Sequence, residues 1–112
     1  MAFNAILEII GRVAKLTLSG ALDASAAPAF RAEIEKAAGQ QPKRLVLLMQ
    51  DLDYIASAGL RVLIFAKQKM GAEVDIYAIA PQEQVRDTFE MTGFHHSIQI
   101  LDGYDADKIE HV

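Results

Sequence analysis

The 112-residue chain carries a formal net charge of −4, and its 11 lysines and arginines are scattered, which argues against direct binding of nucleic acid. Hydrophobic residues make up 52%, enough for a core, but no window reaches the roughly 18 uncharged apolar residues of a membrane span. Because cysteine and a signal-peptide pattern are both absent, we expect one cytoplasmic domain over residues 1–112, without disulfides or thiolate metal ligands.

Two apolar runs, residues 5–10 and 13–18, are separated by a Gly-Arg dipeptide. Glycine accepts the positive φ that two-residue turns require, so these runs predict a β-hairpin. In the second run apolar and polar residues alternate, as in a strand with one buried face. Residues 19–23 then predict a turn.

The first helix is predicted to begin after Asp23 or Ser25, either of which can cap it. It is predicted to end at Gly39, a residue type that commonly terminates helices. Pro28 is tolerated there because it falls in the first turn. One face of this helix collects the apolar residues Phe30, Ile34, Ala37 and Ala38.

The middle of the chain predicts alternating strands and helices. Five consecutive apolar residues at 45–49 indicate a strand buried on both faces. A helix over about residues 58–70 and a strand over residues 74–79 follow. We expect Pro81 at the first position of a third helix, where its missing N–H costs nothing. The inward residues of that helix are expected to be Val85, Phe89 and Met91.

A short edge strand at residues 98–100 and a short amphipathic helix within residues 102–112, using Ile109, complete the chain. The order is β-β-α-β-α-β-α-β-α. This alternation after an opening hairpin predicts an α/β fold, a mixed sheet with its helices packed as a layer.

The residues around Ser57 predict a strand-to-helix corner with a hydroxyl at its tip. Ser57 stands where a helix N-cap is expected, and helix N-termini attract negative charge. Its neighbours Ala56, Ala58 and Gly59 are small and leave the hydroxyl sterically open. Two interpretations stay open: a purely structural cap, or a regulatory phosphorylation site to which Arg61, one turn on, adds a charge-assisted contact.

The helix that follows has two different faces. One stripe contains Ser57, Arg61, Ile64, Phe65 and Gln68. The other contains Leu60, Leu63, Ala66 and Met70. If the second stripe faces the sheet, Ile64 and Phe65 are partly exposed and mark an interaction surface. The alternative is that Ile64 is core and only Phe65 leans outward.

No catalytic residue, metal site or cofactor is predicted. The segment around Ser57 lacks the first glycine of a G-x-S-x-G nucleophile elbow, and none of the histidines is an assignable base. His95 and His96 would point to opposite sides of an extended chain, which argues against a shared metal. Asp51 and Asp53 are interpreted as turn-forming residues. Nucleotide-binding glycine motifs are absent.

Four segments together resemble the STAS-domain proteins of the bacterial anti-sigma factor antagonist type. They are Ser-Gly-Ala-Leu-Asp at 19–23, residues 51–60 around Ser57, Gly-Ala-Glu-Val at 71–74, and Thr-Gly-Phe at 92–94. The second segment is the most specific, and the resemblance covers nearly the whole chain. It implies a mixed sheet with helices mainly on one side.

The resemblance also implies a function. Ser57 would be phosphorylated by an anti-sigma factor or related serine kinase with a histidine-kinase-like ATPase fold, and a PP2C-type phosphatase would reverse this. The unphosphorylated form would bind the anti-sigma factor and free its target. The implied docking surface consists of Asp23, Asp53, Ala56, Ala58, Gly59, Arg61, Ile64 and Phe65.

One position departs from the family pattern, because many members carry an acidic or hydroxylated residue where this chain has Ala56. The alternative function is therefore a STAS interaction module in another partner-switching, sensory or membrane-associated complex, without a phosphorylation cycle. A small hydrolase using Ser57 is the remaining alternative from a different class. We expect the free chain to be a monomer.

Overall fold

The chain opens with the β-hairpin that its two apolar runs predict. The computed structural model describes residues 2–111. Strand β1 (Asn4–Ile10) pairs antiparallel with β2 (Val13–Leu22), and Ile10 lies opposite Val13 across the two-residue turn. Gly11 in that turn has a φ of 58°, which is the positive value that favours glycine there.

The other strands extend the hairpin into a five-stranded sheet with the order β1-β2-β3-β4-β5. Strand β3 (Arg44–Ile55) lies parallel to β2 and to β4 (Asp75–Ile79), and β4 lies parallel to β5 (Gln99–Leu101). The sheet is therefore mixed, as the alternation of elements predicts.

Both central strands are longer than predicted. The expected turn at residues 19–23 is wrong, because residues 19–22 continue β2, and residues 50–55 continue β3. The pairing shifts between Thr17 and Ser19 and again between Gly20 and Ala21, so β3 carries two extra residues opposite β2. These two β-bulges break the two-residue alternation that identifies a strand in a sequence.

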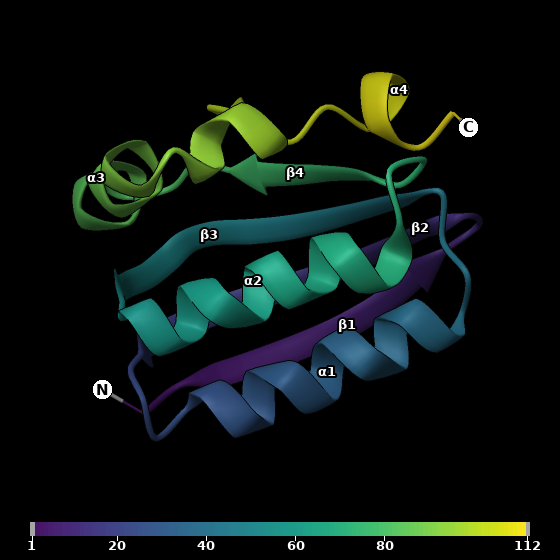
Figure 1. The fold of residues 1–112 in the computed structure, drawn as a ribbon. Helices are drawn as coiled ribbons and strands as arrows, with labels where there is room; N and C mark the ends of the chain where they lie inside the picture. The colour runs from purple at the N-terminus through teal and green to yellow at the C-terminus, as the bar shows by residue number, and fades with distance from the viewer. Residues whose placement is uncertain (1, 112) are drawn as a thin grey trace.

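The helices cover mainly one face of the sheet, as expected (Figure 1). Helices α1 (Ala27–Gly39), α2 (Ser57–Met70) and α3 (Glu83–Thr92), with the 3₁₀ turn η1 (Phe94–Ser97), contribute to one core cluster. The short helix α4 (Ala106–Ile109) instead buries Ile109 in a second cluster on the opposite face.

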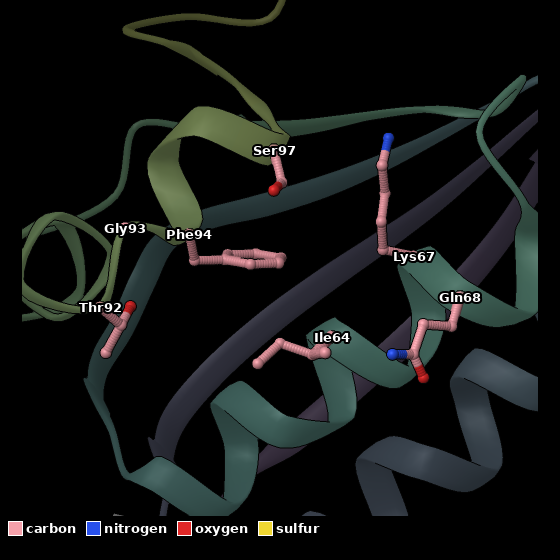
Figure 2. Close-up of a pocket in the computed structure, with 7 residues that line it drawn as sticks. All are labelled: Ile64, Lys67, Gln68, Thr92, Gly93, Phe94 and Ser97. Carbon is pink, nitrogen blue, oxygen red and sulfur yellow. The ribbon is translucent and has the colours of Figure 1, made fainter.

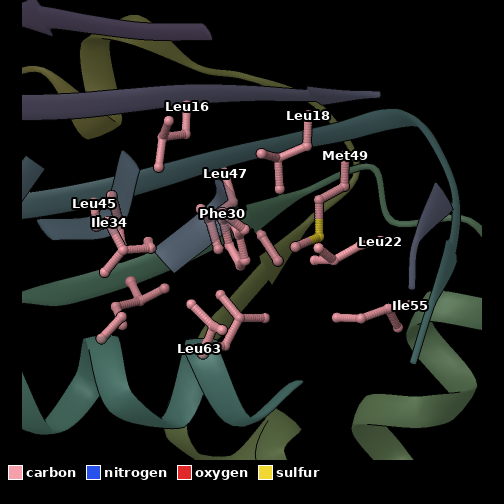
Figure 3. Close-up of a cluster of buried hydrophobic side chains, with 14 of the residues drawn as sticks. Leu16, Leu18, Leu22, Phe30, Ile34, Leu45, Leu47, Met49, Ile55 and Leu63 are labelled. Carbon is pink, nitrogen blue, oxygen red and sulfur yellow. The ribbon is translucent and has the colours of Figure 1, made fainter. Parts of the chain in front are cut away.

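The main core lies between the sheet and the helix layer (Figure 3). Strand side chains at alternate positions meet helix side chains, and ten of them that are fully buried are Leu16, Leu18, Leu22, Phe30, Ile34, Leu45, Leu47, Met49, Ile55 and Leu63. Such aliphatic contacts stabilise a domain by roughly 1.5–3 kcal/mol per fully buried large side chain. On the opposite face Val46 is fully buried, so β3 is buried on both sides there, as predicted.

Two expectations for the third helix are wrong. Helix α3 begins at Glu83 with Gln82 as its N-cap, so Pro81 precedes the helix instead of opening it. Met91 is 87% exposed, whereas Val85 and Phe89 are buried as predicted. Met91 follows Phe89 by two positions, about 200° around the helix, and therefore lies on the face that points away from the core.

Helices α1 and α2 lie side by side and begin at the same end of the molecule, where β2 and β3 also end (Figure 1). This end carries most of the predicted functional residues. In residues 2–111 no helix combines the length and apolar character needed to cross a bilayer.

Candidate functional site

The site is assembled where two parallel strands end together. Leu22, the last residue of β2, lies opposite Ile55, the last residue of β3. The Ala56 N–H donates to the Leu22 carbonyl at 2.9 Å, and this bond ties the two outgoing loops together. The loop that contains Asp23 and the start of α2 at Ser57 are therefore neighbours, although the sequence separates them by 33 intervening residues.

The end of β3 projects beyond β4, whose pairing stops at Leu48, and a side chain from α3 takes the place of the missing strand. The Ile55 N–H donates to Gln84 Oε1 at 2.9 Å, and Gln84 Nε2 donates to the Ile55 carbonyl at 3.2 Å. Gln84 thus satisfies both backbone groups of the residue two positions before Ser57. Sequence reasoning missed it, because no local motif marks a glutamine that reaches another element.

Ser57 is not the N-cap, contrary to the prediction. The N-cap is Ala56, with an extended backbone (φ −90°, ψ 167°), and Ser57 is the first helical residue. No side chain caps the helix, so the exposed Ser57 hydroxyl is not used for capping. The first intrahelical bond runs from the Leu60 N–H to the Ala56 carbonyl at 3.1 Å, so the preceding amides lack intrahelical acceptors.

Gly59 lies in this first turn, on the side that faces the strands, and is buried. A Cβ atom on Gly59 would stand 2.6 Å from Leu22 Cγ and 3.2 Å from Ile55 Cγ1. The glycine therefore allows the first turn of α2 to approach the ends of both strands closely. Gly59 was expected in the docking surface, but it is buried and serves to bring the helix close to the strands. Ala56 and Ala58, on either side of Ser57, are half-buried.

Asp23 organises the neighbouring loop without capping α1, whose N-cap is Ala26 and has no side-chain cap. Its exposed carboxylate accepts hydrogen bonds from the Ser25 hydroxyl at 2.7 Å and from the Ala26 N–H at 3.0 Å. These two bonds, the Ser25 bond foremost, lower the pKa of Asp23 below its ordinary value of 3.8. Pro28 falls in the first turn of α1, as predicted.

The two aspartates before Ser57 lie in β3 and do not form the turn that the sequence predicted. Both Asp51 and Asp53 are exposed. Tyr54, which pairs with Ala21 of β2, is 43% exposed and adds an aromatic side chain to the same end of the sheet. No sequence pattern distinguished Tyr54 from a core residue.

The outer ridge of α2 follows the predicted stripe, with four of its five residues exposed and the fifth partly exposed. Ser57, Arg61, Ile64 and Gln68 are exposed, and Ile64 is 41% exposed. Phe65 is partly exposed, as predicted, and its ring packs against the core with the guanidinium of Arg31 lying 3.9 Å above it. The alternative with Ile64 in the core is thus wrong. The opposite stripe faces the sheet as predicted, with Leu60, Leu63 and Ala66 buried.

A groove lies on each side of this ridge. The first, of about 330 Å³, separates α2 from the end of α3 and η1, and Figure 2 shows Ile64 on one side of it and Phe94 on the other. The second, of about 320 Å³, lies between the N-terminal halves of α1 and α2 and includes Ala58 and Arg61. A ridge between two grooves is a surface that a partner protein can engage from both sides.

Nothing in residues 2–111 assembles a metal centre, since no cluster of three or more histidine and acidic side chains has suitable geometry. His95 and His96 do not lie on an extended chain as assumed; they stand in η1 with ring centroids 3.9 Å apart. The Nδ1 of His95 lies 3.2 Å from the Phe89 carbonyl. Within residues 2–111 no histidine forms a hydrogen bond with the Ser57 hydroxyl.

The chain is a small α/β domain, with a mixed five-stranded sheet and a helix ridge exposed beside the ends of two parallel strands. The model of the STAS domain family matches residues 4–106, so the chain belongs to this family. Among curated proteins it is 36% identical, over 78 residues, to BtrV of Bordetella bronchiseptica, provisionally named an anti-sigma factor antagonist. That match covers 69% of this chain and 67% of BtrV.

Solved structures show the same fold. An anti-sigma factor antagonist from Mycobacterium paratuberculosis has a TM-score of 0.87 at 22% identity, over 97% of this chain and 93% of the other. The Bacillus protein SpoIIAA, an anti-sigma factor antagonist, has a TM-score of 0.78 in its unphosphorylated form, at 22% identity over 97% and 94%. Its phosphorylated form has a TM-score of 0.71, at 21% identity over 97% of each chain.

Proposed function

We propose that the chain is an anti-sigma factor antagonist whose docking is controlled by phosphorylation of Ser57. Its unphosphorylated form binds an anti-sigma factor or serine kinase with a histidine-kinase-like ATPase fold and releases that protein's target. A PP2C-type phosphatase restores the binding form. In this proposal the chain is a cytoplasmic monomer when free, occupies residues 1–112 as one domain, and does no chemistry of its own.

The observation that carries the proposal is the state of the Ser57 hydroxyl. It is exposed, it caps nothing, and it stands at the first residue of a helix in a STAS domain. Small neighbours on both sides leave room for a kinase active site. SpoIIAA, which shares the fold, exists in phosphorylated and unphosphorylated forms, and this supports the same cycle here.

The charge change explains how the modification acts. Phosphorylation adds about −1.5 to −2 charges at neutral pH. At the start of α2 the phosphate meets amides without intrahelical acceptors, which stabilises it by roughly 0.3–1 kcal/mol at an exposed site. The helix therefore tolerates the phosphate, while a partner that approaches the ridge meets a new dianion beside exposed Asp23 and Asp53. Docking weakens without refolding the domain.

A second candidate function has its own support. The ridge residue Ile64 and the two grooves beside it form a docking surface whether or not Ser57 is modified. Ala56, where many relatives carry an acidic or hydroxylated residue, favours this alternative. The chain would then be a STAS interaction module in another partner-switching, sensory or membrane-associated complex.

The test starts with candidate serine kinases encoded near the gene. The purified chain is incubated with each kinase and ATP, and intact mass and site mapping then locate any phosphate. We expect one phosphate, on Ser57, and none in Ser57→Ala. Thr17→Ala, which removes a half-buried hydroxyl from the sheet face opposite the helix layer, is the control and should be modified like the wild type.

Binding to the same kinase separates the two candidates. Ser57→Ala should stay folded and bind constitutively, whereas Ser57→Asp should bind poorly. Equal affinities of these two variants would refute the switch and favour the interaction module. Failure of the PP2C-type phosphatase to restore binding to the phosphorylated chain would refute the proposed cycle while leaving the docking surface intact.

A further inference from the structure

The groove between α1 and α2 combines a small, apolar lining with two arginines. Its volume is about 320 Å³, and Pro28, Ala58 and Val62 are among its lining residues. Arg31 enters it from α1 and Arg61 from α2. Arg31 was not among the expected docking residues, because it belongs to the helix before β3 and joins Ser57 only through the tertiary structure.

The two arginines are held differently. The guanidinium of Arg31 lies 3.9 Å above the Phe65 ring, and its Nε donates to the Glu35 carboxylate at 3.3 Å. These contacts fix the plane of the guanidinium and occupy one of its five donors. Within residues 2–111 no carboxylate lies within ion-pair distance of Arg61, which is exposed one turn beyond Ser57.

The lining of this groove is basic, although the charge of Arg31 is paired with Glu35. The chain as a whole carries a net charge of −4, yet the residues that line this groove include two cations and no acidic group. Guanidinium groups present paired donors that match the two oxygens of a carboxylate. The apolar lining between them favours the aliphatic part of the same side chain.

We propose that this groove binds a glutamate or aspartate that the partner presents from an apolar segment. This inference rests on the proposed function, since it names the chemistry of the partner at the same docking surface. It also gives the Ser57 phosphate a local target. Because Ser57 and Arg61 are separated by one helical turn, the phosphate competes with the carboxylate of the partner for Arg61.

The first test measures the affinity of the nearby-encoded kinase for Arg61→Glu. We expect the dissociation constant to rise at least about tenfold, as for a close interfacial charge pair. Arg12→Glu, at the exposed hairpin turn far along the sheet, makes the same charge change and should leave the affinity within about twofold of the wild type. Replacing the contacting carboxylate of the kinase by lysine should restore binding to Arg61→Glu.

The outcomes distinguish the two proposals. If Ser57→Asp abolishes binding while Arg61→Glu binds as tightly as Arg12→Glu, the switch stands and the groove inference is overturned. If Arg61→Glu loses binding but no acidic substitution in the kinase rescues it, the inference is likewise overturned. If the wild type binds none of the candidate kinases, the proposed function fails, and a measurement that needs no partner decides about the groove.

That measurement is a nuclear magnetic resonance titration of the wild-type chain, which follows the arginine Nε–Hε signals. The probes are the blocked tripeptide acetyl-Leu-Glu-Leu-amide, its glutamine counterpart, and inorganic phosphate. We expect the glutamate peptide, but not the glutamine peptide, to shift the Arg31 and Arg61 signals. In Arg61→Ala, the glutamate peptide should no longer shift the Arg31 signal. Shifts with phosphate but not with the glutamate peptide, or with neither, would overturn the inference.

Discussion

Gly59→Ala tests how tightly the start of α2 must approach the ends of β2 and β3. The added methyl group would stand 2.6 Å from Leu22 Cγ, 2.9 Å from Leu22 Cδ2 and 3.2 Å from Ile55 Cγ1. Carbon atoms in van der Waals contact are about 3.5–4.0 Å apart, so the methyl group overlaps both side chains. Leu22 and Ile55 are themselves fully buried and cannot move away without displacing other core residues.

The magnitude follows from two opposing effects. Overpacking of a filled core costs about 1–3 kcal/mol. The better helix propensity of alanine returns up to about 1 kcal/mol, and less in the first turn. We therefore expect Gly59→Ala to lower the free energy of unfolding by about 0.5–2 kcal/mol. For a domain of this size that corresponds to a fall in Tm of about 2–8 °C.

Urea unfolding followed by circular dichroism, together with a thermal scan, measures the change. The matched control is Gly39→Ala at the end of α1, where an added Cβ meets nothing within 4 Å. This control should be neutral or stabilised by up to about 1 kcal/mol. If Gly59→Ala is as stable as the wild type, or shifts with the same sign as Gly39→Ala, the close approach inferred for α2 is wrong.

Three further predictions concern other residues. Phe65→Ala should lower the free energy of unfolding by about 1–3 kcal/mol, because Phe65 is only partly buried and a fully buried phenylalanine would cost about 3–5 kcal/mol. Unchanged stability in urea would contradict the observed packing. Because the pKa of Asp23 is lowered, the contribution of its carboxylate to stability is complete above pH 3.8 and is lost as the pH falls through the lowered pKa. Ser25→Ala removes the main hydrogen bond and should raise that pKa, as measured by a carboxyl titration with nuclear magnetic resonance. Partial burial, and then the contact with Glu110, raises the pKa of Tyr104 from 10.0 to about 12. The contribution of Tyr104 to stability is therefore complete below pH 10 and is lost as the pH rises through about 12. A tyrosinate absorbance titration should find one tyrosine near 12, and titration of every tyrosine near 10 would contradict the environment described for Tyr104.

Much of the fold could be predicted because the evidence for it is local. The alternating pattern of β2 predicted its buried face, and the spacing of Phe30, Ile34 and Ala37 predicted the buried face of α1. The exposed ridge of α2 followed from the helical repeat as soon as the helix start was placed near Ser57. Each of these inferences needs only neighbours within a few positions along the chain.

The extent of β3 could not be predicted in this way. After Met49 its buried residues are Leu52 and Ile55, which are spaced by three and not by two. The two bulges opposite β2 cause this spacing, and a bulge is defined by the pairing with the partner strand, which the residues of β3 alone do not reveal. The same segment, with its aspartates, therefore looked like a turn.

The sequence by itself determined the type and order of the elements, and it placed a small-flanked serine at the start of an amphipathic helix. Periodicity and chain punctuation are sufficient for this, because they reflect interactions between residues close along the chain. Only the tertiary structure decided that Ala56 is the cap, that Phe65 lies beneath Arg31, and that Gln84 holds the end of β3. Each of these depends on where another helix or strand comes to rest, and that position is set by the packing of the whole core.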